Sequence, residues 1–203
     1  LLIGCSLFAM FFFISLYMQQ VLGYSPIKAG LSYLPLAITI IISAGVASAL
    51  VTKVGFKPIL ALGMALIAIG LVWFGQVSAH GDFVSDILGP SLFAAVGLGF
   101  AFVPVTIAAV SGIEDHEQGL ASGLINTSQQ VGGALGLAVL AAIANGIING
   151  AHDPATLTEG FQAAFLVGAV FAVLGLLATL LLIRSSDSRA HVELSGEAAE
   201  ASQ

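Results

Sequence analysis

The chain has 203 residues, of which 58% are hydrophobic and 8% are charged, and its formal net charge is −6. A soluble domain of this length would carry far more charge, so the composition excludes a soluble enzyme. The basic residues form no cluster, which argues against a nucleic-acid partner.

Six stretches without a charged residue fill the chain from Leu1 to Ile183. Each is long enough to cross the hydrocarbon layer of a bilayer, which takes about 20 apolar residues. The sequence therefore predicts an all-α, polytopic membrane protein with a six-helix transmembrane bundle over residues 1–183. A polar cytoplasmic tail, disordered in water, is expected over residues 184–203. The stretches cover residues 1–27, 29–52, 58–79, 87–113, 118–151 and 160–183.

Within these stretches we expect six helices, joined by short polar segments. The second and fourth helices contain Pro35 and Pro104, each of which removes a helix hydrogen bond and favours a kink. Gly97 and Gly99 make the fourth helix easier still to bend. The expected helices cover about residues 1–22, 28–51, 58–78, 87–111, 119–148 and 160–183.

The basic residues predict how the chain is oriented in the membrane. An even number of crossings puts both chain ends on one side, together with Lys53 and Lys57 between the second and third helices. Arg184 and Arg189 follow the last helix on that side, whereas the opposite side carries only Lys28. Because cytoplasmic loops are enriched in Lys and Arg, the chain ends are expected in the cytoplasm.

The fifth helix carries small residues at a spacing of four, which places them on one face and lets two helix backbones approach closely. Tight packing and a face that slides during a conformational change both fit this pattern. Polar residues also run from Asn126 to Gln130, and lipid-facing amides are costly, so they are expected to face protein or a water-filled cavity. The small-residue series are Ser128, Gly132 and Gly136, and then Gly119, Gly123 and Thr127.

Several kinds of chemistry find no support in the sequence. No ionisable residue lies deep within an expected span, so a proton-coupling carboxylate is expected elsewhere in a longer protein, with Asp86 and Glu114 as alternatives at helix ends. The four histidines lie in loops or the tail without metal-ligand spacing, and no phosphate-binding loop occurs, so neither a metal nor a cofactor is expected. Ser122 in the run 121–123 has no histidine within a span to act as its base, which argues against an intramembrane protease.

Three sequence runs resemble the C-terminal half of drug/proton antiporters of the major facilitator superfamily, and are most similar to the fourteen-helix multidrug-resistance branch. The resemblance covers the apolar chain from Leu1 to Ile183 and implies that it is the C-terminal part of a longer protein. The runs are GLGF at 97–100, VPVT at 103–106 and GLASGLINTSQQVGGALG at 119–136.

A fourth run resembles the superfamily's cytoplasmic loop motif, Gly-x-Leu-Ala-Asp-Arg-x-Gly-Arg followed by Lys or Arg. In SALVTKVGFK at 48–57, Lys53, Gly55 and Lys57 fit the motif, whereas Thr52 replaces its Asp. The replacement by Thr52 therefore leaves undecided whether this chain makes the charge contact that the motif's Asp makes in the family.

The resemblance implies that the first and fourth helices line a central cavity, that the second and fifth pack against the missing N-terminal half, and that the third and sixth face lipid. It implies a plasma-membrane secondary active exporter of small lipophilic compounds, working by proton antiport and alternating access. An uptake carrier for a metabolite, or a non-transporting membrane sensor or scaffold, remain alternatives. The expected partners are the bilayer, the missing half, protons and a small-molecule substrate. The candidate substrate-cavity residues are Tyr17, Gln20, Thr106, Asn126 and Gln130.

Overall fold

The computed structural model of the chain describes residues 1–110, 113–114, 116–184, 188 and 192. Within this part of the chain, six helical segments are long and apolar enough to cross a membrane, which confirms the all-α, six-span fold. The expectation of a disordered tail falls mostly on residues outside the described part.

The six spans are built from the following helices. The first consists of α1 (Leu2–Leu16) and a π-helical turn, η1 (Tyr17–Val21). The second consists of α2 (Pro26–Ser32) and α3 (Leu34–Val54), and the third is α4 (Phe56–Phe74). The fourth consists of a π-helical turn, η2 (Phe83–Leu88), and α5 (Gly89–Val110). The fifth is α6 (Gln118–Ile148) and the sixth is α7 (Pro154–Leu182).

Two spans begin earlier than the sequence predicted, because acidic residues cap them. The Asp153 carboxylate accepts hydrogen bonds of 2.9 Å from the backbone N–H and the hydroxyl of Thr156, so α7 begins at Pro154 instead of residue 160. These bonds also hold the pKa of the Asp153 carboxyl below its ordinary value. Asp82 likewise accepts from the N–H of Val84 at the start of η2. A search for charge-free stretches misses such polar first turns, where side-chain capping favours helix.

The two prolines affect their helices differently. Pro35 lies in the first turn of α3, and the helix is interrupted just before it at Tyr33, so the expected kink is a break between α2 and α3. Pro104 lies inside α5, which continues through it. A proline is accommodated most easily in a first turn, where its missing N–H has no helical partner to lose.

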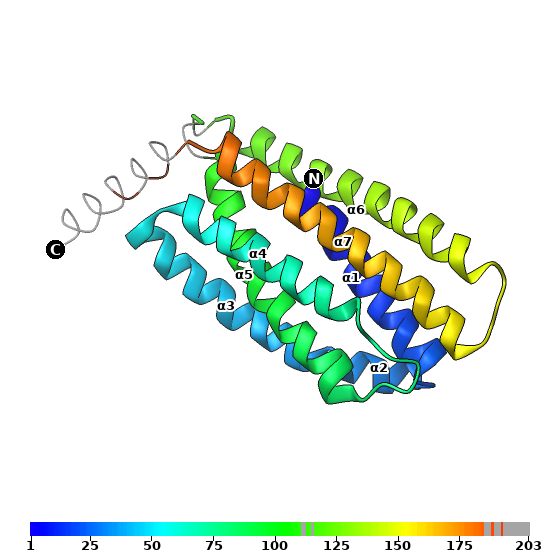
Figure 1. Cartoon of the computed structure of the whole chain (residues 1–203). Coiled ribbons are helices and arrows are strands. Elements are labelled where there is room, and N and C mark those ends of the chain that lie inside the picture. Colours follow the sequence, from blue (N-terminus) through cyan, green and yellow to red (C-terminus); the bar gives the residue numbers. More distant parts are fainter. Residues whose placement is uncertain (111–112, 115, 185–187, 189–191, 193–203) are drawn as a thin grey trace.

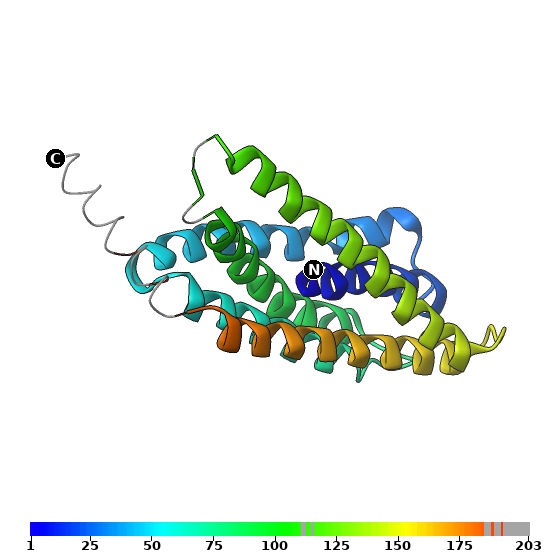
Figure 2. The same ribbon diagram turned by 90° about the horizontal axis from the view of Figure 1, so that it is seen from above.

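The helices form one bundle in which α1, α6 and α7 pack together, α3 and α4 pack on α5, and α4 joins α7. Figure 1 shows the spans running side by side, and Figure 2 shows α4 and α7 along one side of the bundle. On the opposite side lie α3 and the first part of α6, with α1 and α5 between. Which side meets another half stays a prediction.

An aromatic cluster joins the first, third and sixth spans. Phe74 of α4 stacks on Phe165 of α7 with ring centroids 5.0 Å apart, and Phe13 of α1 meets Phe165 edge to face at 6.2 Å. Such pairs contribute about 0.5–1.5 kcal/mol beyond the area they bury. This cluster ties α7 to both α1 and α4.

The glycines of α5 lie at close helix contacts. A Cβ added at Gly97 would lie 2.6 Å from the backbone nitrogen of Ile67 in α4, and one added at Gly99 would lie 2.7 Å from that of Ala44 in α3. Both distances are far shorter than an ordinary carbon contact. These two glycines, expected to ease bending, thus also allow α5 to fit tightly between α3 and α4.

Candidate functional site

The small-residue face of α6 lies against α1. A Cβ added at Gly136 would lie 2.5 Å from the Cα of Cys5, and Gly132 packs on the backbone of Leu1. The thiol of Cys5 also donates a 3.0 Å hydrogen bond to the carbonyl of Gly132. The partner of this face is therefore the first span, whereas sliding along it stays a prediction.

The second series of small residues has a different environment. A Cβ added at Gly119 or Gly123 would meet no described atom within 4 Å apart from the adjoining residues and backbone of its own helix. The hydroxyl of Thr127 donates 2.8 Å back to the carbonyl of Gly123 within the same helix. These positions leave an open, narrow strip on α6.

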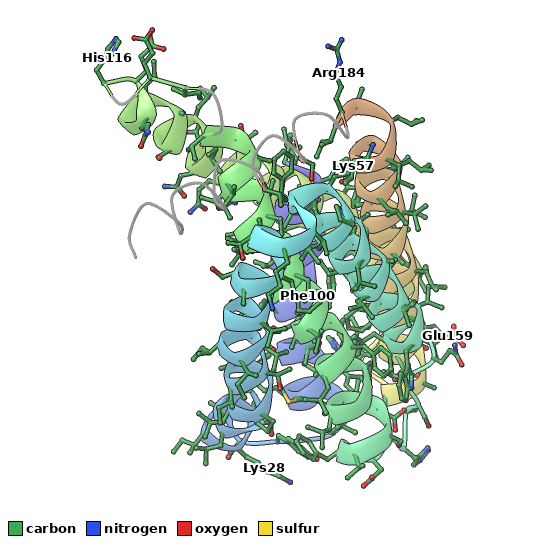
Figure 3. All side chains as sticks on the ribbon, turned by 90° about the vertical axis from the view of Figure 1, so that its left-hand side faces the viewer. Lys28, Lys57, Phe100, His116, Glu159 and Arg184 are labelled. Atoms are coloured by element: carbon green, nitrogen blue, oxygen red, sulfur yellow. The ribbon has the colours of Figure 1, made fainter. Side chains whose placement is uncertain are left out.

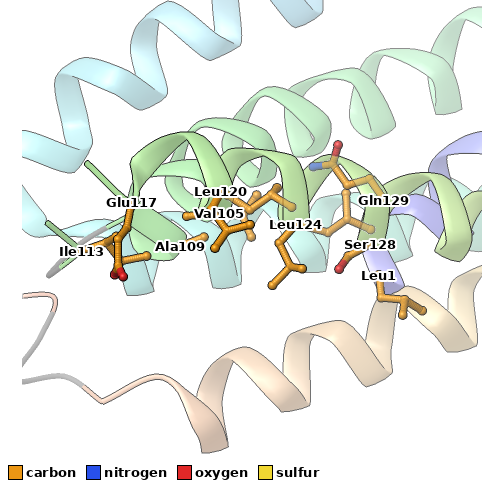
Figure 4. A pocket seen from close by; sticks show the side chains of 12 residues that line it. Leu1, Val105, Ala109, Ile113, Glu117, Leu120, Leu124, Ser128 and Gln129 are labelled. Carbon is orange, nitrogen blue, oxygen red and sulfur yellow. The ribbon is translucent and has the colours of Figure 1, made fainter. Parts of the chain in front are cut away.

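An apolar groove of about 430 Å³ runs between α5 and the first half of α6, and is closed at one end by Leu1. Figure 4 shows its walls, which include Val105 and Ala109 from α5 and Leu120 and Leu124 from α6. Its volume falls in the range of small-molecule sites, roughly 300–1,000 Å³. The groove adjoins the face of α6 that packs on Leu1 and Cys5.

Three polar side chains border the groove, and sequence reasoning did not assign two of them to a site. Glu117 lies at one end, and Ser128 and Gln129 lie at the other, near Leu1. Gln129 stands three residues before Gly132 and seven before Gly136, so the helical period of 3.6 would have placed it near this face. The groove can hold an apolar molecule and offers hydrogen bonds only at its ends.

The five candidate cavity residues are not brought together in one place. Tyr17 is buried inside the bundle, 1% exposed, and its hydroxyl donates a 2.6 Å hydrogen bond to the carbonyl of Ser78. Gln20, on η1, is exposed and lines a cavity at another end of the bundle. Tyr17 therefore packs in the core of this structure and does not reach an open face.

The other three candidates are exposed on two helices. Thr106 lies on α5, where its hydroxyl donates 2.9 Å to the carbonyl of Phe102. Asn126 and Gln130 lie on α6 with exposed side chains, one helical turn apart. None of the three lines the α5–α6 groove or the cavity that contains Gln20.

The expected cytoplasmic loop is a turn of one residue. Lys53 belongs to the last turn of α3 and Lys57 to the first turn of α4, and only Gly55 between the helices has a left-handed backbone, with φ of +84°. A Cβ on Gly55 would lie 2.6 Å from the carbonyl oxygen of Ser188, so glycine is required both for the turn and for this contact.

Lys57 ties the start of α4 to the end of α7. Its ammonium group donates hydrogen bonds to the carbonyls of Leu180 at 3.0 Å and Ile183 at 2.6 Å. Its backbone N–H donates to the hydroxyl of Ser188 at 3.2 Å. A cation at a helix C-terminus satisfies free carbonyls and complements the helix dipole. This basic residue thus holds two helices of the same bundle together.

The charged side chains lie toward the two ends of the bundle. Lys57, Arg184 and His116 lie at one end in Figure 3, and Lys28 lies at the opposite end. Glu159 lies in the first two turns of α7, so the described charges leave the middle of the spans uncharged. This arrangement suits a bundle whose middle is surrounded by hydrocarbon.

These features define a polytopic, α-helical membrane protein with closely packed spans. Residues 1–137 match the model of the Major Facilitator Superfamily, and the chain belongs to this family of membrane transporters, which are not enzymes.

The relatives of the chain include export and resistance proteins. Cephamycin export protein CmcT of Amycolatopsis lactamdurans is 36% identical over 84% of this chain and 35% of its own length. Puromycin resistance protein pur8 of Streptomyces alboniger is 28% identical over 87% of this chain and 37% of its own length. The tetracenomycin C resistance and export protein of Streptomyces glaucescens is 37% identical over 64% of this chain and 24% of its own length. The chain spans about a third of the length of the first two relatives.

Proposed function

We propose that this chain is the C-terminal, six-helix half of a secondary active exporter of small lipophilic compounds or drugs. The observation that carries the proposal is the 36% identity to a cephamycin export protein over 84% of the chain. The names of further relatives, which include a puromycin and a lincomycin resistance protein, support export over uptake.

The proposed mechanism is alternating access, in which this bundle rocks against an N-terminal half around a central site. The tight contact of α6 with α1 and of α5 with α3 and α4 supports a bundle that moves as one body. Gln20, Thr106, Asn126 and Gln130 are proposed as residues of the cavity or its edge, because their polar side chains are exposed. Tyr17 is proposed to support the cavity wall from behind.

Proton antiport is proposed as the source of energy. The described charges lie near helix ends, and a proton relay at the membrane midplane normally requires an embedded ionisable group. The coupling carboxylate is therefore proposed to lie in the N-terminal half. The chain ends are proposed to be cytoplasmic and the protein to reside in the plasma membrane, since Lys57 and Arg184 lie at the same end.

The test is export of a fluorescent cationic dye from cells that produce the full-length protein, with and without a protonophore. Export that stops when the proton gradient collapses supports the proposal. Accumulation of a compound instead of its loss would indicate an uptake carrier. No movement of any compound by a well-produced protein would indicate a membrane sensor or scaffold.

A further inference from the structure

The segment between the third and fourth spans, residues 75–82, lies across one end of the bundle. Figure 1 shows it leaving the end of α4, passing the end of the first span and reaching the start of the fourth. Lys57 lies in the first turn of α4 and this segment follows the last residue, Phe74, so it lies at the end of the bundle opposite to the Lys57 contact. Residues 75–82 are called the strap below.

Two side chains from other spans donate hydrogen bonds to neighbouring carbonyls of the strap. The Tyr17 hydroxyl of η1 donates to the carbonyl of Ser78 at 2.6 Å. The Gln162 amide of α7 donates to the carbonyl of Val77, also at 2.6 Å. These donors are 61 and 85 residues away from their acceptors in the sequence. The strap therefore joins the third span to both the first and the sixth.

The surroundings of these two bonds make them costly to break. Tyr17 and Val77 are each only 1% exposed, so breaking a bond here would leave polar groups without a water molecule to replace the partner. The Ser78 carbonyl also accepts from the N–H of Gly81 at 3.1 Å. One turn of the strap therefore closes on the same carbonyl that binds Tyr17.

Gly81 fits the strap closely between the first and fourth spans. A Cβ added at Gly81 would meet the hydroxyl of Tyr17 and would lie 2.7 Å from the Oδ2 of Asp86 in η2. That carboxylate oxygen accepts from the N–H of Asp82 at 2.7 Å and from the hydroxyl of Ser85 at 3.1 Å. The far end of the strap is thereby fixed to the start of the fourth span.

The strap completes a set of contacts that join α4 and α7 at both ends. At one end, Lys57 donates to the last carbonyls of α7. At the other end, Phe74 stacks on Phe165 and Gln162 donates to the strap. The bond from Tyr17 adds the first span to this pair of helices.

We propose that the strap makes the first, third and sixth spans move as one unit during transport, with Tyr17 and Gln162 as the residues that position it. The strap stays closed in both the inward-facing and the outward-facing state, because opening it would break buried bonds that hold three spans. Motion is then confined to the contact with the other half of the transporter. The proposal rests on the proposed function for its role in transport, but closure of the strap can be measured without transport.

The test is hydrogen–deuterium exchange of the full-length protein in lipid nanodiscs, read at the amides of Gly81 and Asp82. Both N–H groups are hydrogen-bonded in the closed strap. Tyr17→Phe and Gln162→Leu are each expected to speed exchange at these amides by about fivefold, since each removes one bond that resists opening. The double variant is expected to speed it by about 25-fold, because both bonds resist the same opening. Exchange in the middle of α6 should stay unchanged.

The matched controls are Tyr24→Phe and Gln20→Leu, which make the same chemical changes near the same end of the first span. The Tyr24 ring packs under the ammonium group of Lys28, and Gln20 lines a cavity that no strap residue lines. Both variants should keep the exchange rates of the wild-type protein. Equal exchange in Tyr17→Phe and Tyr24→Phe would overturn the proposal. Faster exchange throughout α6 in Tyr17→Phe would also overturn it, because the bond would then stabilise the whole fold and not the strap.

Adding a substrate tests whether the strap stays closed while the protein changes state. Exchange at the strap is expected to be the same with and without saturating ethidium, a fluorescent cationic dye. A tenfold or greater rise with ethidium would show that the strap opens as a gate, and would overturn the proposal. The expected effects of Tyr17→Phe and Gln162→Leu on exchange, in a protein that exports no compound, would instead contradict only the proposed function.

Discussion

The contact of α6 with α1 gives the sharpest test of how this bundle is packed. In Gly136→Ala the new Cβ would lie 2.5 Å from the Cα and 2.7 Å from the Cβ of Cys5, whereas carbon atoms in ordinary contact are 3.4–4 Å apart. Because both neighbouring atoms are held close to the backbone of α1, the two helices must separate locally by about 1 Å. Overpacking of this kind typically costs about 1–3 kcal/mol.

The control is Gly146→Ala in the same helix, where an added Cβ meets no described atom within 4 Å apart from the adjoining residues and backbone of that helix. Both substitutions change helix propensity alike, by about 1 kcal/mol in favour of alanine, so this term cancels in their difference. We expect Gly136→Ala to be less stable than Gly146→Ala by about 1–3 kcal/mol in unfolding of the full-length protein in mixed micelles. Equal stability of the two variants would refute the close α1–α6 contact.

The remaining predictions concern the end of the bundle near α3, α4 and α7. Gly55 and Gly150 both have positive φ, so an alanine at either position should cost about 1–3 kcal/mol in backbone strain. Gly55→Ala should destabilise the protein further, because only Gly55 also packs on the chain beyond α7. Equal losses in thermal unfolding would contradict that contact. Lys57→Met should lower stability by about 1.5–3 kcal/mol, since it removes charged hydrogen bonds to the last carbonyls of α7, whereas Lys53→Met, which alters an exposed residue, should not. A similar melting temperature for both variants would contradict a stabilising role of these Lys57 hydrogen bonds. A cysteine at His152 should react with an impermeant thiol reagent from outside intact cells, and one at Lys57 should not; the reverse labelling would overturn the orientation proposed from basic residues.

The arrangement of the candidate residues shows how far one-dimensional patterns reach. Small residues at a spacing of four predicted that Gly132 and Gly136 share a face, and the structure adds that Leu1 and Cys5 lie against it. The same spacing at Gly119 and Gly123 meets no described neighbour within 4 Å. Helical periodicity tells which residues share a face, but not which neighbour that face meets.

Polar residue type was a weaker guide to position. Tyr17 and Gln20 are close in sequence and both polar, yet Tyr17 is buried with its hydroxyl bonded to Ser78, and Gln20 lines an open cavity. Their difference follows from the direction of each side chain on η1, which depends on the helices packed around it. Asn145 and His152 reach the same cavity as Gln20 only because α6 ends beside the first span.

The sequence alone determined that this protein lies in a bilayer, how many times it crosses it and to which family it belongs. Charge is expelled from hydrocarbon at high cost, so six crossings are visible as charge-free stretches, and the family's runs are contiguous along the chain. Only the tertiary structure decided that Lys57 binds the end of α7 and that Gly55 packs against Ser188. In a bilayer the lipid is as apolar as the helix interfaces, so hydrophobicity cannot distinguish a buried face from a lipid-facing one. Close packing and hydrogen bonds between distant residues make that distinction.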